Sequence, residues 1–119
     1  GFSDVFFTPV STQFLSNSIS TLCSIDYRGV INISSSEVLT KFDFAIMVSN
    51  ALGNSSSLIG KGSIIDSYLP TIRPNFLALD NSRLRDLNAV VIPKIEQMVD
   101  NICGDIHARR RLQGYEKEM

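Results

Sequence analysis

The amino-acid sequence predicts an α/β fold, in which helices alternate with short strands. Apolar residues recur at helical spacing in several stretches of the chain. One short β-branched run, Val30 to Ile33, lies between Gly29 and a serine cluster, which is typical of a buried strand. The 119 residues are 44% apolar and 19% charged, and this composition predicts a packed globular structure rather than a disordered chain.

The N-terminal part is expected to hold an extended piece, a helix and the strand. Val5 to Phe7 is apolar and is ended by Pro9, so we expect it to be extended. A helix is expected from about Ser11 to Ser24. The apolar residues that recur at helical spacing there are Phe14, Leu15, Ile19, Leu22 and Cys23. The strand from Val30 to Ile33 would need neighbours on both of its edges.

A second helix is expected to begin at Thr40. Thr40 and Asp43 have the spacing of a capping box, in which hydroxyl and carboxylate satisfy free amides at a helix start. The helix is expected to stop at Gly53. Leu58 to Tyr68 is expected to be one extended segment, interrupted by glycines.

The segment from Arg73 to Leu84 is the most distinctive part of the sequence. Pro74 fixes its own φ at about −65° and favours an extended Arg73, so the arginine stands on a stiff arm. Asp80, Asn81 or Ser82 can then cap a short helix that runs through Leu84 and Leu87.

The last helix is expected to start near Pro93, which suits a first helical turn. Its apolar face ends at Ile106. Residues 107–119 are charged, so we expect a solvated helix end or a frayed tail.

Three segments stand in an order that one enzyme family shares. Asp4 to Val10 reads Asp-Val-Phe-Phe-Thr-Pro-Val. Gly29 to Glu37 and then Thr40 to Ala45 combine a glycine-led run, small polar residues and a helix start. Arg73 to Leu84 holds an Arg-Pro pair, then a Leu-Asp pair and an Arg-Leu pair. These segments resemble the C-terminal portion of dTDP-4-dehydrorhamnose reductases, members of the extended short-chain dehydrogenase/reductase superfamily.

The resemblance covers nearly the whole chain and implies a division of it. Residues 1–35 would end the nucleotide-binding sheet region, with a helix and a last Rossmann-type strand. Residues 36–106 would form a small α+β substrate-binding subdomain with its closing helix, and residues 107–119 a charged tail. The parent protein would be an NAD(P)H-dependent reductase of a 4-keto nucleotide sugar, which makes dTDP-L-rhamnose or a relative for cell-surface polysaccharide.

The cofactor and proton-donor motifs of that superfamily are missing from this sequence. NADPH or NADH binds there at a glycine-rich turn that opens a helix, and Gly60-Lys61-Gly62 lacks the third small residue and a helical continuation. The catalytic pair is a tyrosine with a lysine four residues later. The three tyrosines, Tyr27, Tyr68 and Tyr115, have Ile31, Ile72 and Met119 at that spacing. We expect an N-terminal part outside this chain to hold the cofactor, and the chain alone to be inactive as a reductase.

The resemblance makes Arg73 the first candidate for substrate binding. Its guanidinium can clamp a diphosphate with parallel hydrogen bonds, or it can pair with Asp80 or a carbonyl and hold the loop. Asn75 can bind sugar or base, or it can form the turn. Ser34, Ser35 and Ser36 follow the predicted strand, at the sheet edge where α/β proteins bind ligands. Their hydroxyl groups can form hydrogen bonds with the hydroxyls of a sugar, or they can cap the next helix.

Other functions and partners remain to be weighed against the reductase. A formal charge of −1 argues against nucleic-acid binding. No apolar run reaches the roughly 18 residues that cross a bilayer, so we expect a cytoplasmic protein without membrane contact. The same family includes the non-catalytic beta subunit of methionine adenosyltransferase, so a regulatory subunit is the alternative. A free-standing domain would cover its strand edges by forming a homodimer.

Overall fold

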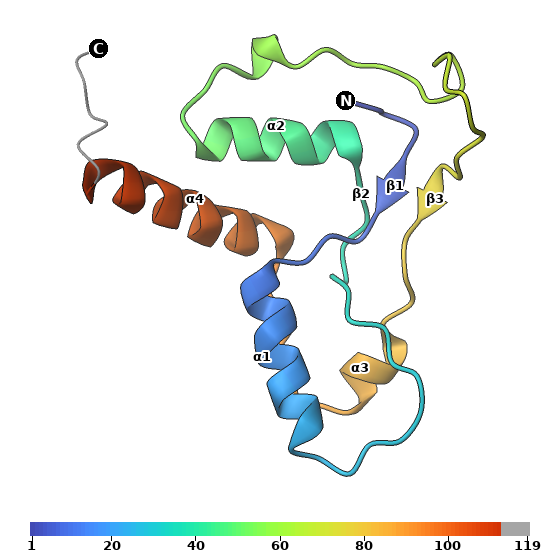
Figure 1. Cartoon of the computed structure of the whole chain (residues 1–119), viewed down its shortest axis with the longest axis vertical. Coiled ribbons are helices and arrows are strands. Elements are labelled where there is room, and N and C mark those ends of the chain that lie inside the picture. The colour runs from blue at the N-terminus through green and yellow to red at the C-terminus, as the bar shows by residue number, and fades with distance from the viewer. Residues whose placement is uncertain (113–119) are drawn as a thin grey trace.

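The computed structural model describes residues 1–112 and shows a small α/β fold, which confirms the predicted class (Figure 1). Those residues form four α-helices and one three-stranded mixed sheet. The elements in chain order are β1 (Phe6–Phe7), α1 (Thr12–Cys23), β2 (Leu39–Thr40), α2 (Lys41–Ala51), the 3₁₀ turn η1 (Ser56–Leu58), β3 (Phe76–Leu77), α3 (Ser82–Asp86) and α4 (Ile95–Leu112).

The sheet has β1 at its centre, in the order β2-β1-β3. β1 pairs with β2 in the antiparallel direction, and Phe6 lies opposite Thr40. It pairs with β3 in the parallel direction, and there Phe6 lies opposite Phe76. The predicted extended piece at Val5 to Phe7 is therefore confirmed as the strand that joins two distant parts of the chain.

The caps of α1 and α2 follow the predictions closely. The Ser11 hydroxyl accepts from the Phe14 amide at 3.1 Å and so starts α1. The Thr40 hydroxyl accepts from the Asp43 amide at 3.0 Å and donates to the Asp43 carboxylate at 2.7 Å. The carboxylate thus binds the Thr40 hydroxyl rather than a free amide. Gly53 follows α2 with φ of 73°, a left-handed conformation that glycine adopts without strain.

The predicted strand from Val30 to Ile33 does not form within residues 1–112. Gly29 turns the chain with φ of 121°, and no other strand of residues 1–112 pairs with the run that follows. The Val30 carbonyl instead accepts from the Arg83 guanidinium at 2.8 Å. A β-branched run favours extended backbone, but a strand also needs a partner, and the described chain supplies none.

Two smaller predictions also differ from the structure, and a third is met for the described residues. Leu58 is the last residue of η1, and the chain from there to Tyr68 is an irregular loop, not one extended segment. Pro93 lies two residues before α4, whose first residue is Ile95. α4 continues past Ile106 to Leu112, so residues 107–112 form a helix end, which is the first of the two alternatives expected for this segment. The rest of the segment, residues 113–119, lies outside the described residues.

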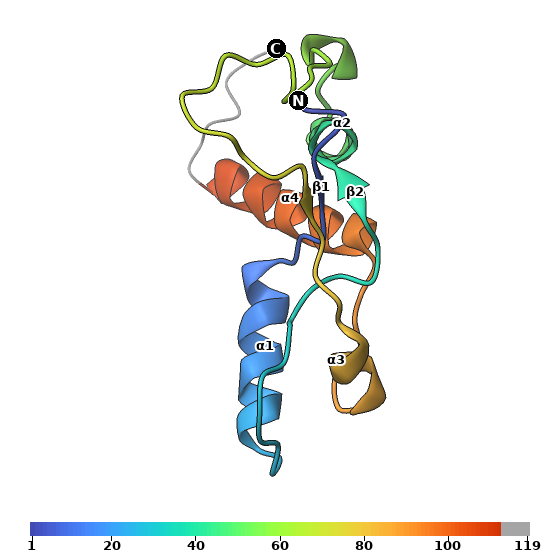
Figure 2. The ribbon, with the colours of Figure 1, turned by 90° about the vertical axis from the view of Figure 1, so that its right-hand side faces the viewer.

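The core lies where α1, α3 and α4 meet, and α2 covers α4 on the other side (Figures 1 and 2). Leu84 of α3 is completely buried and Phe14 of α1 is nearly so. The remaining buried members of this core come from α4 and are Ile95, Met98, Val99 and Cys103. Among residues 1–112, no helix has the length and apolar character that a membrane crossing requires.

The start of α4 is held by a carboxylate from a distant part of the chain. The Glu37 carboxylate accepts from the Ile95 amide, the first of the helix, at 2.7 Å. It therefore takes the part of an N-cap side chain, and a negative charge also suits the helix N-terminus. Glu37 directly follows Ser34, Ser35 and Ser36, which we call the serine segment. The contact therefore connects the serine segment to the core helix α4, across 58 residues of sequence.

Substitution of this carboxylate should loosen α4. We expect Glu37→Ala to lower the free energy of unfolding by about 1 kcal/mol, the usual worth of a helix cap. Glu37→Gln keeps an acceptor oxygen and should lose less than half of that. Urea unfolding followed by circular dichroism measures both variants. Equal stability of Glu37→Ala and the unsubstituted chain would contradict the capping role.

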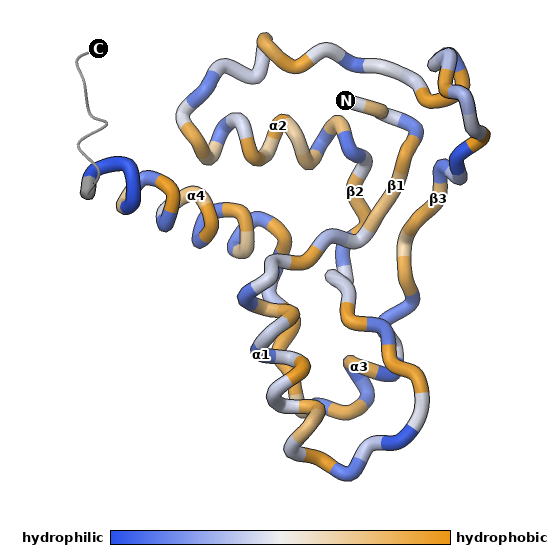
Figure 3. Tube along the Cα trace, viewed as in Figure 1, coloured by the Kyte–Doolittle hydropathy of each residue, from blue (hydrophilic) through white to orange (hydrophobic). Residues whose placement is uncertain are grey.

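The chain is more open than folded monomers of its size. Its radius of gyration is 17.3 Å, against about 13.5 Å for a compact domain of this length. Its accessible surface of 8786 Å² exceeds by about a third the roughly 6,400 Å² that size scaling gives for a folded monomer. Apolar segments contribute to this surface in the loop that precedes β3 and on β3 itself (Figure 3). The exposed large side chains there include Leu58, Ile65, Tyr68, Ile72 and Phe76.

Candidate functional site

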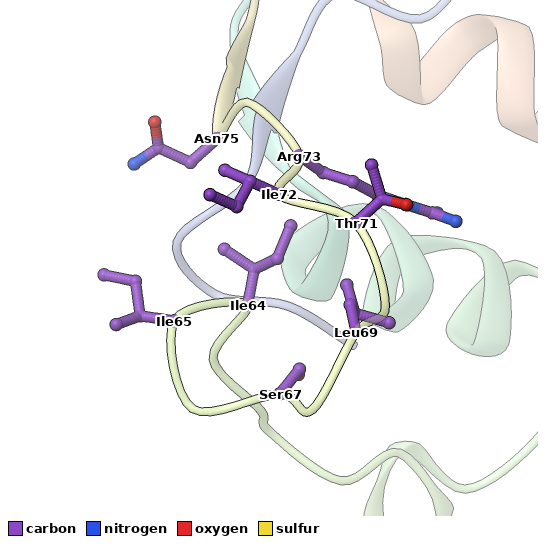
Figure 4. A pocket seen from close by; sticks show the side chains of 8 residues that line it. All are labelled: Ile64, Ile65, Ser67, Leu69, Thr71, Ile72, Arg73 and Asn75. Atoms are coloured by element: carbon purple, nitrogen blue, oxygen red, sulfur yellow. The ribbon is translucent and has the colours of Figure 1, made fainter.

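A cavity of the described chain lies in the loop between η1 and β3 (Figure 4). Its volume is about 430 Å³, within the range of small-molecule sites. The loop curls back on itself, so that residues from both of its limbs line the space. They are Ile64, Ile65, Ser67, Leu69, Thr71, Ile72, Arg73 and Asn75. We call the space that these residues line the loop cavity.

Arg73 lines the loop cavity as an exposed cation without a partner. It forms neither a hydrogen bond nor an ion pair with any of residues 1–112. The expected alternative, a pair with Asp80, does not form. The Asp80 carboxylate instead accepts from the Ser82 amide at 2.8 Å. An unpaired guanidinium on a proline-stiffened arm is free to bind an anion.

Asn75 also lines the loop cavity, and its backbone is fixed. Its carbonyl accepts from the Phe6 amide at 2.8 Å, where the loop enters β3. Its side-chain amide points to the opposite side of the loop from Arg73 (Figure 4). The two side chains therefore suit different parts of an extended ligand rather than one atom.

The walls between these two polar groups are mostly apolar. Ile64 points across the turn toward Ile72, whose side chain is fully exposed (Figure 4). Thr71 and Ser67 add hydroxyl groups to the lining. A ligand that combines an anionic group with a flat or apolar body fits this arrangement.

The predicted serine site lies elsewhere and is built differently. Ser34 and Ser35 are buried, with exposed fractions of 0% and 1%. The Ser34 hydroxyl donates to backbone carbonyls, and the Ser35 hydroxyl donates to the Glu37 carbonyl at 2.8 Å. Ser36 is exposed, and none of the three lines the loop cavity. The structure thus brings Arg73 and Asn75 together but leaves Ser34, Ser35 and Ser36 apart from them.

Asn81 organises this serine segment. Its side-chain amide donates to the Ser34 carbonyl at 3.0 Å and to the Ser36 hydroxyl at 3.1 Å. It was one of three candidates for capping α3, yet its side chain makes no cap bond. Asp80 takes that part, and its hydrogen bonds from Ser82 hold the pKa of its carboxyl below the ordinary value.

The apolar lining of the loop cavity was not predicted from the sequence. Ile64, Ile65 and Ile72 stand among serines, glycines and prolines, where an isolated isoleucine has no periodicity to place it on a face. The available signal was the density of large apolar residues between Leu58 and Ile72 in a stretch without helical or strand spacing. Such a stretch indicates an exposed apolar loop, which is an indicator of binding.

The described residues do not fit a nicotinamide cofactor or a metal ion. Gly62 forms a bridge with Phe2 and no helix starts behind it, so Gly60 to Gly62 lacks the helix N-terminus that holds a pyrophosphate. The Tyr27 hydroxyl donates to the Val30 carbonyl at 3.2 Å, and no lysine lies four residues after it. Within residues 1–112, no three His, Cys, Asp or Glu side chains are grouped to bind a metal.

No protein-family model, curated protein or solved structure matches this chain.

Proposed function

We propose that this chain is the substrate-binding portion of an NAD(P)H-dependent reductase that acts on a 4-keto nucleotide sugar of the dTDP-L-rhamnose type. The observation that carries the proposal is Arg73, an unpaired cation on the lining of the loop cavity. Arg73 also opens the Arg-Pro segment on which the family resemblance rests most strongly.

The chemistry of a nucleotide sugar matches the groups that line the loop cavity. The guanidinium of Arg73 would form two parallel hydrogen bonds to the diphosphate. Asn75 would reach hydroxyl or carbonyl groups at one end of the ligand, because its side chain points away from Arg73. Ile64 and Ile72 would pack on the flat faces of base or sugar.

In this proposal the chain binds and orients substrate, and another part of the protein reacts with it. The described residues do not fit NADPH or NADH, so the N-terminal part would hold the cofactor, which supplies hydride, together with the tyrosine that supplies the proton. The residues of this chain would fix the position of the sugar and exclude water from it.

The run from Val30 to Ile33 supports the presence of such an N-terminal part. Its four amides form no hydrogen bond within residues 1–112, and Val30 is 75% exposed. A run rich in β-branched residues, whose amides have no partner among residues 1–112, suits pairing with a strand from outside the described chain. We propose that this run is the last strand of the nucleotide-binding sheet.

The proposal predicts a large effect of Arg73 on nucleotide affinity. In the protein expressed from its native gene, Arg73→Ala should raise the Kd of dTDP by about 10- to 100-fold, because a hydrogen-bonded charge is lost. Arg73→Lys should raise the Kd less, since lysine keeps the positive charge but lacks the planar guanidinium that forms two parallel hydrogen bonds. Arg28→Ala is the control, because Arg28 is exposed and, among residues 1–112, forms an ion pair with Asp26 alone, at 3.6 Å. Isothermal titration calorimetry measures all four proteins.

Two outcomes would count against the proposal. Equal dTDP affinity of Arg73→Ala and Arg28→Ala would remove Arg73 from the site. A gene that starts directly at Gly1, without an upstream glycine-rich turn and Tyr-x-x-x-Lys pair, would exclude an autonomous reductase. Co-purification with a partner enzyme would then favour the regulatory subunit.

A further inference from the structure

The loop cavity is held at both of its ends by the first seven residues of the chain. At the far end, the Phe6 amide donates to the Asn75 carbonyl at 2.8 Å, next to the pairing of β1 with β3. At the near end, the Ser3 amide donates to the Gly62 carbonyl at 2.9 Å. The N-terminal segment is therefore hydrogen-bonded to both ends of the loop.

The side chain of Asp4 binds the turn that the loop makes at Ser63 and Ile64. Its carboxylate accepts from the Ser63 hydroxyl at 2.5 Å and from the Ile64 amide at 2.9 Å. The turn continues into the lining, because the Ser67 hydroxyl donates to the Ser63 carbonyl at 2.7 Å. These hydrogen bonds hold the pKa of the Asp4 carboxyl below its ordinary value, the Ser63 hydroxyl being the main cause.

The opposite limb of the loop has no such support. Thr71, Ile72 and Arg73 form no hydrogen bond with any of residues 1–112. Their positions therefore depend on the two tied ends and on the turn that Asp4 holds. A loosened turn would spread the lining residues over more conformations, and a ligand would have to order them again.

We propose that Asp4 is a positioning residue of the loop cavity, which holds the turn at Ser63 and Ile64 so that the lining is ordered before a ligand binds. Its importance for dTDP affinity rests on the proposed function. Its effect on the order of the loop does not, because that effect is measured without any ligand.

The experiment compares three variants with the unsubstituted chain of 119 residues. Asp4→Ala removes both acceptor oxygens, Asp4→Asn keeps one, and Ser63→Ala removes the hydroxyl donor alone. Asp80→Asn is the matched control. Like Asp4, Asp80 is a carboxylate that accepts hydrogen bonds from a backbone amide, but its partner is Ser82 at the start of α3 and not a residue of the loop. Hydrogen exchange by NMR, thermal unfolding and dTDP titration are measured for each protein.

Asp4→Ala should speed exchange of the Ile64 amide by about tenfold or more, since a charge-assisted hydrogen bond is lost. Asp4→Asn should lie between Asp4→Ala and the unsubstituted chain. The thermal midpoint should change little, because Asp4 is only partly buried and water can reach the groups that lose the carboxylate. The Kd of dTDP should rise by about tenfold in Asp4→Ala and stay constant in Asp80→Asn.

The pH profile adds a readout that a general loss of structure would not give. A carboxyl with a lowered pKa keeps its contacts at every pH above its unfolded pKa and loses them as the pH falls through the folded pKa. Exchange of Ile64, corrected for its intrinsic pH dependence, should therefore be flat at neutral pH and rise only below about pH 4. In Asp4→Ala this rise should be absent.

Each outcome decides one part of the inference. Unchanged Ile64 exchange in Asp4→Ala would show that Asp4 does not hold the turn, and would overturn the proposal. Faster exchange with unchanged dTDP affinity would overturn the positioning role. If the unsubstituted chain fails to bind dTDP, the exchange and pH measurements still decide whether Asp4 orders the loop, and only the proposed function fails.

Discussion

Leu84→Ala should destabilise the chain more than any other single truncation named here. Leu84 lies on the short helix α3, and its side chain is completely buried against α1 and α4. Truncation removes favourable apolar burial and leaves a cavity that three separate helices cannot easily close. We expect the free energy of unfolding to fall by about 2 to 5 kcal/mol.

The matched control for this substitution is Leu58→Ala. Leu58 is 82% exposed in the turn η1, so its truncation should change stability by less than about 0.5 kcal/mol. Urea unfolding followed by circular dichroism measures both variants. If Leu84→Ala cost no more than Leu58→Ala, the helices around α3 would not form the cooperative core described above.

The helices could be predicted because their signals are local. Ser11 and Thr40 cap α1 and α2 where the sequence places them, and Gly53 lies just beyond α2 as predicted. The strands could not be predicted with the same success. β2 and β3 have two residues each, and their identity depends on the partner that β1 supplies. Val30 to Ile33 is the opposite case. Its sequence is typical of a strand, but it has no partner strand in the described chain and is irregular.

The candidate site was predictable only in part, for a related reason. Arg73 and Asn75 stand in a motif whose proline restricts the chain locally, and both do line the loop cavity. The path of the other limb depends on Asp4, which is 59 residues before Ser63 in the sequence. The position of the serine segment likewise depends on Asn81, 47 residues after Ser34. Contacts at such separations leave no periodic pattern in a single sequence.

Asn81→Ala tests whether the serine segment is a structural element or a sugar site. Asn81 is 6% exposed, and its amide is the donor for the Ser34 carbonyl at 3.0 Å. Without that donor a buried carbonyl loses its partner, which costs about 1 to 3 kcal/mol. We therefore expect a loss of stability in this range, measured by urea unfolding.

Ser36→Ala completes the test, because Ser36 is exposed and only its hydroxyl is shared with Asn81, at 3.1 Å. A structural serine segment predicts a loss below about 1 kcal/mol for Ser36→Ala and an unchanged Kd for the nucleotide sugar. A sugar site would show the opposite pattern, with stability kept and affinity lost. Since Ser34 and Ser35 already donate to backbone carbonyls, we expect the structural pattern, with substrate recognition left to Arg73 and the loop cavity.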